Sequence, residues 1–284
     1  MTPTSLGLLG LGAMLILIFG GVPIGVAMGL VGLVGFAAMS GLDPALAILG
    51  LAPYSSVASY TLTVIPLFVL MGQFAAMSGL SRELYETANR WLGHRRGGLA
   101  MANVVACGGF AAVSGSSLAT SATMAVVALP EMRRHGYDPR LATGSIAAGG
   151  TLGILIPPSV MFLIYGILTE QSIGKLFLAG VVPGIVLVLL YVLAIAVVTW
   201  RNPALGPAVA RVPLPERLVA LRRVWPVLAL FALVIGGMYV GAFTATEGAA
   251  VGAAGAFVLA LARGAVTWRL LGRALVETVH TTAV

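Results

Sequence analysis

A run of glycine and hydroxyl residues interrupts one of the apolar stretches of this chain. Residues 108–124 read GGFAAVSGSSLATSATM. Within hydrocarbon every backbone N–H and C=O needs an internal partner, so a non-helical break there lines a cavity or is buried in protein. Hydroxyl and carbonyl oxygens suit Na⁺, and the N-termini of half-helices suit a carboxylate. The candidate ion- and substrate-binding residues are Ser114, Gly115, Ser116, Ser117, Thr120 and Ser121, with Ser114, Ser116 and Ser117 as candidate sodium ligands.

The alternative is that these serines only hydrogen bond to backbone groups that the break leaves free. A second break, GGTLGILIPPS at residues 149–159, offers the tip a partner. Pro157 and Pro158 remove two successive backbone donors, and three glycines loosen the turn before them. Broken helices opposite such tips expose carbonyls and helix ends to ions at the membrane midplane. The competing interpretation is a proline kink that serves packing alone.

A third polar segment is GAFTATEGAAVGAAG at residues 241–255. A carboxylate at the centre of a membrane helix costs about 2.5–3.5 kcal/mol, so Glu247 needs a reason. One reason is a capping box, in which Thr244 caps a helix and Glu247 sits at its third position. The other is direct contact of Glu247 with an ion or solute.

The composition identifies a polytopic membrane protein. Mean hydropathy is +1.04, and charged residues are 9% of the chain, against about 25% in globular proteins. The net charge of +7 would suggest nucleic acid in a soluble chain, but here it lies in short loops and indicates topology and anionic lipid. The first residues lack a basic start and a cleavage site, so we expect a retained span. The single cysteine, Cys107, excludes an internal disulfide and is expected to be a small buried hydrophobe.

The arginines determine the predicted topology. Positive loops stay cytoplasmic, so an even number of crossings must separate each basic cluster from the next. Two pairs of predicted spans satisfy this rule, because each pair crosses out and back between two basic clusters. The pairs are 141–168 with 177–200, and 224–242 with 245–262. The four clusters are Arg82, Arg90, Arg95 and Arg96; Arg133, Arg134 and Arg140; Arg201, Arg211, Arg217, Arg222 and Arg223; and Arg263, Arg269 and Arg273.

Between the first two clusters lie two short apolar arms, residues 100–113 and 118–130. Each is about 20 Å of helix against about 30 Å of hydrocarbon. Neither arm is therefore expected to span, and residues 100–130 are predicted to be a re-entrant hairpin that enters and leaves on the cytoplasmic side.

The predicted fold is all-α. Further spans are expected at 6–20, 24–40 and 63–79, an interfacial helix at 43–57, and an amphipathic arm at 81–93 that starts from an N-cap at Ser81. The expected organisation is N-terminal scaffold helices at 1–80, a cytoplasmic arm at 81–99, the hairpin at 100–130, a broken helix and the next span at 141–200, a cytoplasmic linker at 201–223, and the start of a second repeat at 224–284.

Several of these segments together resemble the large membrane subunit of tripartite ATP-independent periplasmic (TRAP) transporters. The resemblance covers essentially the whole chain. It rests on PLFVLMGQ (66–73), GHRRGGLAMANV (93–104), SGSSLATSATM (114–124), LPEMRRHGYDP (129–139), AAGGTLGILIPPSVMFLIYGILTEQSIGKLFLAG (147–180) and GMYVGAFTATEGAAV (237–251).

The resemblance implies an elevator-type transporter of the bacterial inner membrane, built from inverted repeats and driven by sodium, with no other cofactor. It implies a small four-helix membrane subunit, a periplasmic substrate-binding protein and an organic-acid substrate such as a C4-dicarboxylate. Nucleic acid is not an expected partner. The site residues it implies are Ser114, Gly115, Ser116 and Ser117; Gly150, Thr151, Pro157 and Pro158; and, by analogy alone, Thr244, Thr246 and Glu247.

One departure from the family concerns length. Family members continue with a second hairpin, whereas this sequence ends at HTTAV (280–284), after an expected second arm at 266–279. The chain is therefore expected to be a fragment or a truncated product that does not transport alone.

Two other classes compete with a transporter. An intramembrane serine hydrolase would need Ser116 or Ser117 beside His94, His135 or His280, and these histidines lie in loops or at the end of the sequence. A non-transporting scaffold subunit would leave the polar tip unexplained. A related elevator family, the dicarboxylate/sodium symporters, is not expected to share TEQSIGKLFLAG. No enzymatic activity is expected.

Overall fold

The computed structural model describes residues 3–58 and 60–283. The described residues form helices and irregular segments and contain no strand, which confirms the all-α prediction. They divide into two compact units, one up to Leu62 and one from Thr63 to Ala283.

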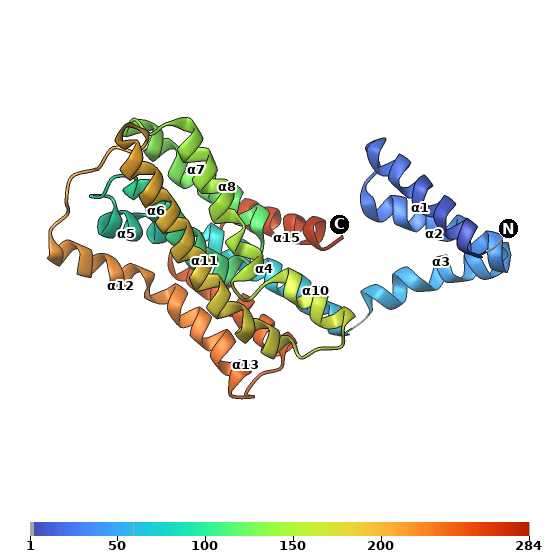
Figure 1. Ribbon diagram of the computed structural model, residues 1–284. Helices are drawn as coiled ribbons and strands as arrows, with labels where there is room; N and C mark the ends of the chain where they lie inside the picture. Colours follow the sequence, from blue (N-terminus) through green and yellow to red (C-terminus); the bar gives the residue numbers. More distant parts are fainter. Residues whose placement is uncertain (1–2, 59, 284) are drawn as a thin grey trace. The chain divides into compact units, whose positions relative to one another are not determined.

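The first unit is three apolar helices, α1 (Pro3–Phe19), α2 (Ile24–Ser40) and α3 (Leu42–Val57) (Figure 1). Gly21 and Pro23 turn the chain between α1 and α2, with Gly21 at a φ of 87° that a residue with a side chain rarely adopts. Among the side chains described in this unit only Ala27 and Ala45 are buried. Such apolar helices, exposed on most sides, suit hydrocarbon. The predicted helix at 43–57 is present as α3, and its place at the membrane interface stays a prediction.

The second unit contains the remaining helices, and the site lies within it (Figure 1). Their bounds are α4 (Val64–Met77), α5 (Leu80–Leu92), α6 (Gly98–Ser114), α7 (Ser117–Arg134), α8 (Pro139–Gly150), α9 (Leu152–Leu155), α10 (Val160–Leu168), α11 (Ile173–Arg201), α12 (Leu214–Phe231), α13 (Gly237–Tyr239), α14 (Ala245–Ala262) and α15 (Trp268–Ala283). Short turns of other helix types are η1 (Tyr60–Thr63), η2 (Pro203–Leu205) and η3 (Ala232–Gly236).

Five segments of the described chain are long and apolar enough to cross a membrane. They agree with five of the predicted spans, while α1 and α2 have 17 residues each. The five are Tyr60–Met77, Pro139–Leu168, Ile173–Arg201, Leu214–Tyr239 and Ala245–Ala262.

The two arms of the predicted hairpin are longer than expected. Helix α6 has 17 residues and α7 has 18, or roughly 25–27 Å of helix each. The predicted arm lengths were too short, because helical residues extend to Gly98 at one end and Arg134 at the other. Both arms are still shorter than about 30 Å of hydrocarbon. Neither arm is among the five candidate spans, and α7 carries charges in its last turn. The re-entrant course thus rests on the arginine pattern and stays a prediction.

Helix α6 is the centre of the second unit. Fourteen of its 17 residues are buried, and it contacts α4, α5, α7, α8, α9, α11 and α12. A helix that is apolar on all sides must be enclosed by other helices or by lipid. Cys107 on this helix is fully buried, as predicted.

The predicted amphipathic arm at 81–93 is α5, but it does not begin at an N-cap Ser81. Gly79, at a φ of 79°, is the residue before the helix, and Ser81 is buried in its first turn. The apolar face of α5 includes Leu84 and Tyr85 and packs against α6 and α12. The apolar face of α5 is therefore packed against other helices of the protein.

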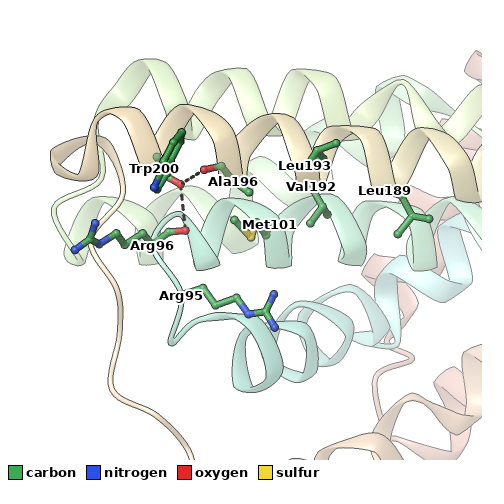
Figure 2. A pocket seen from close by; sticks show the side chains of 9 residues that line it. Arg95, Arg96, Met101, Leu189, Val192, Leu193, Ala196 and Trp200 are labelled. Carbon is green, nitrogen blue, oxygen red and sulfur yellow. Dashed lines mark hydrogen bonds between the residues drawn. The ribbon is translucent and has the colours of Figure 1, made fainter.

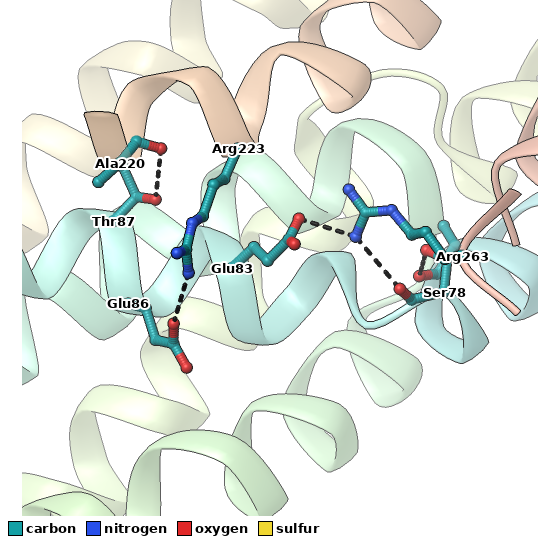
Figure 3. Close-up of polar contacts among 8 residues, drawn as sticks. Ser78, Glu83, Glu86, Thr87, Ala220, Arg223 and Arg263 are labelled. Carbon is teal, nitrogen blue, oxygen red and sulfur yellow. Dashed lines mark hydrogen bonds and ion pairs between the residues drawn. The ribbon is translucent and has the colours of Figure 1, made fainter. Parts of the chain in front are cut away.

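Polar contacts connect α5 to helices far along the chain (Figure 3). An Arg263 nitrogen lies 2.8 Å from a Glu83 carboxylate oxygen and donates to the Ser78 carbonyl at 3.2 Å. The Thr87 hydroxyl donates to the Ala220 carbonyl at 3.2 Å. These contacts hold α5 against α12 and against the residue that follows α14.

Half of the predicted linker at 201–223 is helical. Helix α12 begins at Leu214, directly after Pro213 and with Pro215 in its first turn, positions that suit proline because no intrahelical donor is lost. Arg217 in this helix is 5% exposed, and its Nε donates to the Val212 carbonyl at 2.8 Å.

We predict that Arg263→Gln lowers the free energy of unfolding by about 1 kcal/mol, because a partly shielded charge loses both a carboxylate and a carbonyl partner. The matched control is Arg223→Gln, whose nitrogen lies 3.8 Å from Glu86 in a half-exposed pair. It should cost about 0.3 kcal/mol or less. Denaturant titration in mixed micelles measures both values. Equal losses of unfolding free energy in the two variants would contradict the stronger stabilising role given to Arg263.

Candidate functional site

The Ser-Gly-Ser-Ser segment forms a tight turn between two helices. Helix α6 ends at Ser114, and Gly115 follows with a φ of 62°. Ser116 is extended, and its hydroxyl accepts a hydrogen bond from the Ala119 amide at 3.3 Å. A left-handed glycine ends one helix and a serine caps the next, which are the usual local signals for those positions.

A hydrogen bond between two hydroxyls spans this turn. Ser114 and Thr120 are both buried, and their oxygens lie 2.8 Å apart. The bond joins the last residue of α6 to the first turn of α7. Both hydroxyls thus have a protein partner, and each still has oxygen lone pairs.

The second predicted break is present between α8 and α10. Thr151 separates α8 from the single turn α9, and residues 156–159 are not helical. Pro157, Pro158 and Ser159 are buried there. The Ser159 hydroxyl donates to the Ile154 carbonyl at 2.6 Å, which satisfies one carbonyl that the prolines leave free.

The two breaks contact each other directly. The Val160 amide, first in α10, donates to the Gly115 carbonyl at 3.2 Å. A β-carbon on Gly115 would lie 2.5 Å from the Pro158 carbonyl oxygen, closer than atoms pack without displacement. Glycine is therefore required at the turn both for its backbone angle and for this approach.

Glycines on neighbouring helices allow the same close packing around the tip. A β-carbon on Gly153 would lie 2.5 Å from the Ser116 carbonyl oxygen and 2.8 Å from the Ser117 nitrogen. One on Gly150 would clash with the Ser121 hydroxyl. One on Gly72 of α4 would lie 2.9 Å from the Ser114 α-carbon. Sequence reasoning did not assign Gly72, although it lies in a motif that was singled out, because no local pattern names its partner.

Helix ends of both signs meet at this crossing. The N-termini of α7 and α10 and the C-termini of α6 and α9 lie at the two breaks. Helix N-termini favour negative charge and helix C-termini favour positive charge. The crossing therefore combines helix ends that favour an anion with helix ends that favour a cation.

Two hydroxyls at the crossing make no hydrogen bond to other residues in the described part of the chain. They belong to Ser117 and Ser121, both half-buried on α7. Ser117 also brings its carbonyl oxygen close to Gly150, 3.2 Å from the position of an added β-carbon. Neutral oxygens of this kind are the ligands that this site can offer to a hard cation.

Thr151 lies apart from the tip. It is exposed, and its hydroxyl contacts the Ala148 carbonyl at 2.7 Å and the Tyr191 hydroxyl of α11 at 3.0 Å. The structure therefore brings Gly150, Pro158 and the Ser114–Thr120 turn together but directs Thr151 toward α11.

The Thr244–Glu247 pair forms the predicted capping box at the start of α14. The Thr244 amide and hydroxyl each donate to the Glu247 carboxylate at 2.8 Å, and the Glu247 amide donates to the Thr244 hydroxyl at 3.3 Å. The capping interpretation is confirmed. Thr246 is half-buried beside it, and no hydrogen bond described for these three residues reaches the tip. Direct contact of Glu247 with an ion stays a prediction.

Asn103 is a buried polar residue that sequence reasoning did not assign. Its amide nitrogen has no hydrogen-bond partner within the described part of the chain and lies against Gly149 of α8. Asn103 lies among apolar residues of a helix that is buried on most sides, so no signal in the sequence distinguished it from an ordinary core position.

No histidine hydrogen bonds to Ser116 or Ser117 among the residues that the structure describes. The His135 ring contacts Glu131 of its own helix. Burial and then the charges of Arg217, Arg211 and Arg95 lower the pKa of His94 in its loop. The described residues also contain no cluster of three histidine, cysteine or acidic side chains able to hold a metal. The pairing required for a serine hydrolase is thus not formed in the described chain.

The fold is that of a multi-pass, all-α membrane protein in which two interrupted helices meet. The chain belongs to the family described as tripartite ATP-independent periplasmic transporter, DctM component, whose model matches residues 11–284. This membership makes it a multi-pass inner-membrane protein and not an enzyme.

Curated relatives agree with this family. A C4-dicarboxylate TRAP transporter large permease protein DctM of Pseudomonas aeruginosa is 47% identical over 194 residues, 68% of this chain and 45% of that protein. The Vibrio cholerae protein of the same name is 39% identical over 241 residues, 84% and 52% of the two chains. A sialic acid TRAP transporter large permease protein SiaM of Vibrio cholerae is 34% identical over 232 residues, 80% and 53%. The chain thus spans about half the length of these relatives.

We predict that Gly115→Ala destabilises the protein more than Gly136→Ala does. Both glycines are left-handed, at φ of 62° and 71°, but a β-carbon on Gly136 meets nothing within 4 Å. Each variant should lose about 1–2 kcal/mol to backbone strain, and Gly115→Ala about 1–3 kcal/mol more to overpacking.

The free energies of unfolding of the two variants give this difference. If Gly136→Ala lowers the free energy of unfolding as much as Gly115→Ala does, then Gly115 is not required for the close contact between the tip and Pro158.

Proposed function

We propose that this chain forms the permease of a sodium-coupled, binding-protein-dependent secondary transporter that imports a small organic acid. The observation that carries the proposal is the hydrogen bond from the Val160 amide to the Gly115 carbonyl. It joins two interrupted helices at one polar crossing. Interrupted helices that meet within a membrane protein are the arrangement in which transporters bind solutes and coupling ions.

A sodium ion would bind at the turn between α6 and α7. The hydroxyls of Ser114, Ser116 and Ser117, with nearby carbonyls, supply neutral oxygen ligands and no thiolate or imidazole. Ser117 is the first ligand to test, because its hydroxyl is not engaged by another described residue. The other two keep lone pairs beyond their present hydrogen bonds.

The substrate would place a carboxylate or similar anionic group near the starts of α7 and α10. Two helix N-termini there carry the partial positive charge that favours an anion. Relatives are named for C4-dicarboxylate, sialic acid, isethionate and 2,3-diketo-L-gulonate. An organic acid is the substrate class that both observations favour.

The hairpin of α6 and α7 would be re-entrant from the cytoplasm. Basic residues flank it at Arg96 and at Arg133, and positive loops favour the cytoplasmic side. The hairpin and the broken helix would then move as one elevator body, since backbone contacts connect their tips. The small membrane subunit would hold the surrounding scaffold, and a periplasmic binding protein would deliver substrate, as the tripartite name of the family indicates.

The test is uptake of a labelled C4-dicarboxylate by proteoliposomes. They hold the permease built on this chain and its small membrane subunit, with the binding protein outside. Uptake should require an inward sodium gradient. Ser117→Ala should raise the sodium concentration for half-maximal uptake about tenfold, the equivalent of one lost ligand interaction.

The matched control is Ser172→Ala, an exposed serine in the connector before α11, which should leave the sodium dependence unchanged. Uptake that proceeds equally with sodium or potassium outside would contradict sodium coupling. An unchanged sodium dependence in Ser117→Ala would contradict the assigned ligand.

A further inference from the structure

A groove of about 450 Å³ runs along α11 and ends at the loop between α5 and α6 (Figure 2). Leu189, Val192, Leu193 and Ala196 of α11 form its wall, and Met101 of α6 lies beside them. These α11 positions share one helix face by their spacing of three and four residues. The groove is therefore an apolar channel parallel to a membrane-spanning helix.

The end of the groove is basic and aromatic. Arg95, Arg96 and Trp200 line it, and Trp200 is 76% exposed. In the described part of the chain, the ion pairs engage Arg223, Arg263 and His135 and leave both groove arginines without a carboxylate. Tryptophan and arginine near the end of a span are typical of the headgroup level of a bilayer.

The loop that carries the two arginines is held in place. The Thr199 hydroxyl of α11 donates to the Arg96 carbonyl at 3.2 Å, as Figure 2 shows. The Gly97 amide donates to the Gly206 carbonyl at 2.8 Å, and a β-carbon on Gly97 would lie 2.7 Å from the Thr199 methyl carbon. The backbone beneath the arginines is thus arranged before any ligand binds, which lowers the entropic cost of binding.

Further basic residues gather around this loop. Arg211 and Arg217 lie close enough to His94 to act on it together with Arg95. Arg217 is 5% exposed, and one of its terminal nitrogens has no hydrogen-bond partner among the residues that the structure describes. A buried guanidinium without a full set of partners raises the local preference for an anion.

We propose that this groove binds one anionic phospholipid, with the phosphate beside Arg95 at the basic end, where Arg96 adds positive charge, and an acyl chain along α11. The apolar wall matches the chain, the guanidinium groups match the phosphate oxygens, and the place of the arginines at the end of a span matches the depth of a headgroup. A helix from a protein partner would cover the apolar wall and leave the two arginines unpaired, so the charge favours a lipid.

The experiment uses Trp200 as a reporter, because it lines the groove. In the 284-residue chain, Trp91, Trp225 and Trp268 are replaced by phenylalanine. The protein is reconstituted in phosphatidylcholine vesicles that contain one brominated lipid. This lipid is either phosphatidylglycerol with brominated acyl chains or phosphatidylcholine with brominated acyl chains. Quenching of Trp200 fluorescence measures how often each lipid occupies the groove.

We expect brominated phosphatidylglycerol to occupy the groove about tenfold more strongly than brominated phosphatidylcholine. Arg95→Gln combined with Arg96→Gln should remove this preference. The matched control is Arg269→Gln combined with Arg273→Gln, two exposed arginines of α15, which removes the same charge and should keep the preference. Circular dichroism and gel filtration check that each variant is folded.

Three results would overturn the proposal. Equal quenching by the two lipids would show that the arginines do not select an anion. An equal loss in the control pair would assign the preference to general surface charge. Absence of quenching by both lipids would show that the groove excludes lipid, as a bound protein helix would.

Discussion

The hydrogen bond from the Val160 amide to the Gly115 carbonyl is the constraint on which the candidate site depends. Each of these groups lies where its own helix is interrupted and no intrahelical partner exists. In an apolar interior, an unpaired backbone group costs several kcal/mol. Each helix break is therefore stabilised by the other, because the two supply each other's missing backbone hydrogen bond. The breaks also bring four helix ends and several hydroxyls to one place, so the feature that satisfies the backbone also makes the site polar.

Packing around the crossing follows from the same requirement. The tip can approach Pro158 only without a β-carbon at Gly115, and the same holds for Gly72, Gly150 and Gly153 against neighbouring parts of the hairpin. Helix α6 is enclosed on most sides, and α5 is held by contacts to α12 and α14. The hairpin and the broken helix are consequently parts of one packed body, as a unit that moves together would have to be.

Local chemistry made much of the fold and part of the site predictable. The helix break at the double proline before α10 and the Thr244–Glu247 cap were predicted from residues close together in sequence, and both are present. Gly115 at the turn and Ser116 before α7 follow the same local chemistry, although they were predicted only as binding residues. Hydropathy likewise predicted the five long apolar segments. These features need no knowledge of distant contacts.

What sequence reasoning missed depends on residues far apart in the chain. No pattern of neighbouring residues in the sequence indicates three of the observed contacts. They are the contact of Gly72 with Ser114, the packing of Gly150 on Ser121 and the hydrogen bond between Thr151 and Tyr191. The arms of the hairpin were predicted too short, because the helices continue beyond the apolar residues, to Gly98 at one end and to Arg134 at the other. The start of α5 was placed at Ser81, whereas the left-handed Gly79 precedes the helix.

The central claim is that the tip of the hairpin is a polar site reached from water within a membrane protein. The most direct measurement is the reaction of a cysteine at this tip with a membrane-impermeant thiol reagent. Ser116→Cys is made in a Cys107→Ala background, where it is the only thiol, and the reagent is added to either face of sealed vesicles. We predict that this cysteine reacts, at a rate that changes with sodium and substrate, while a cysteine at the fully buried Ala111 stays unreactive. A Ser116→Cys thiol that is unreactive from both faces under all conditions would contradict it.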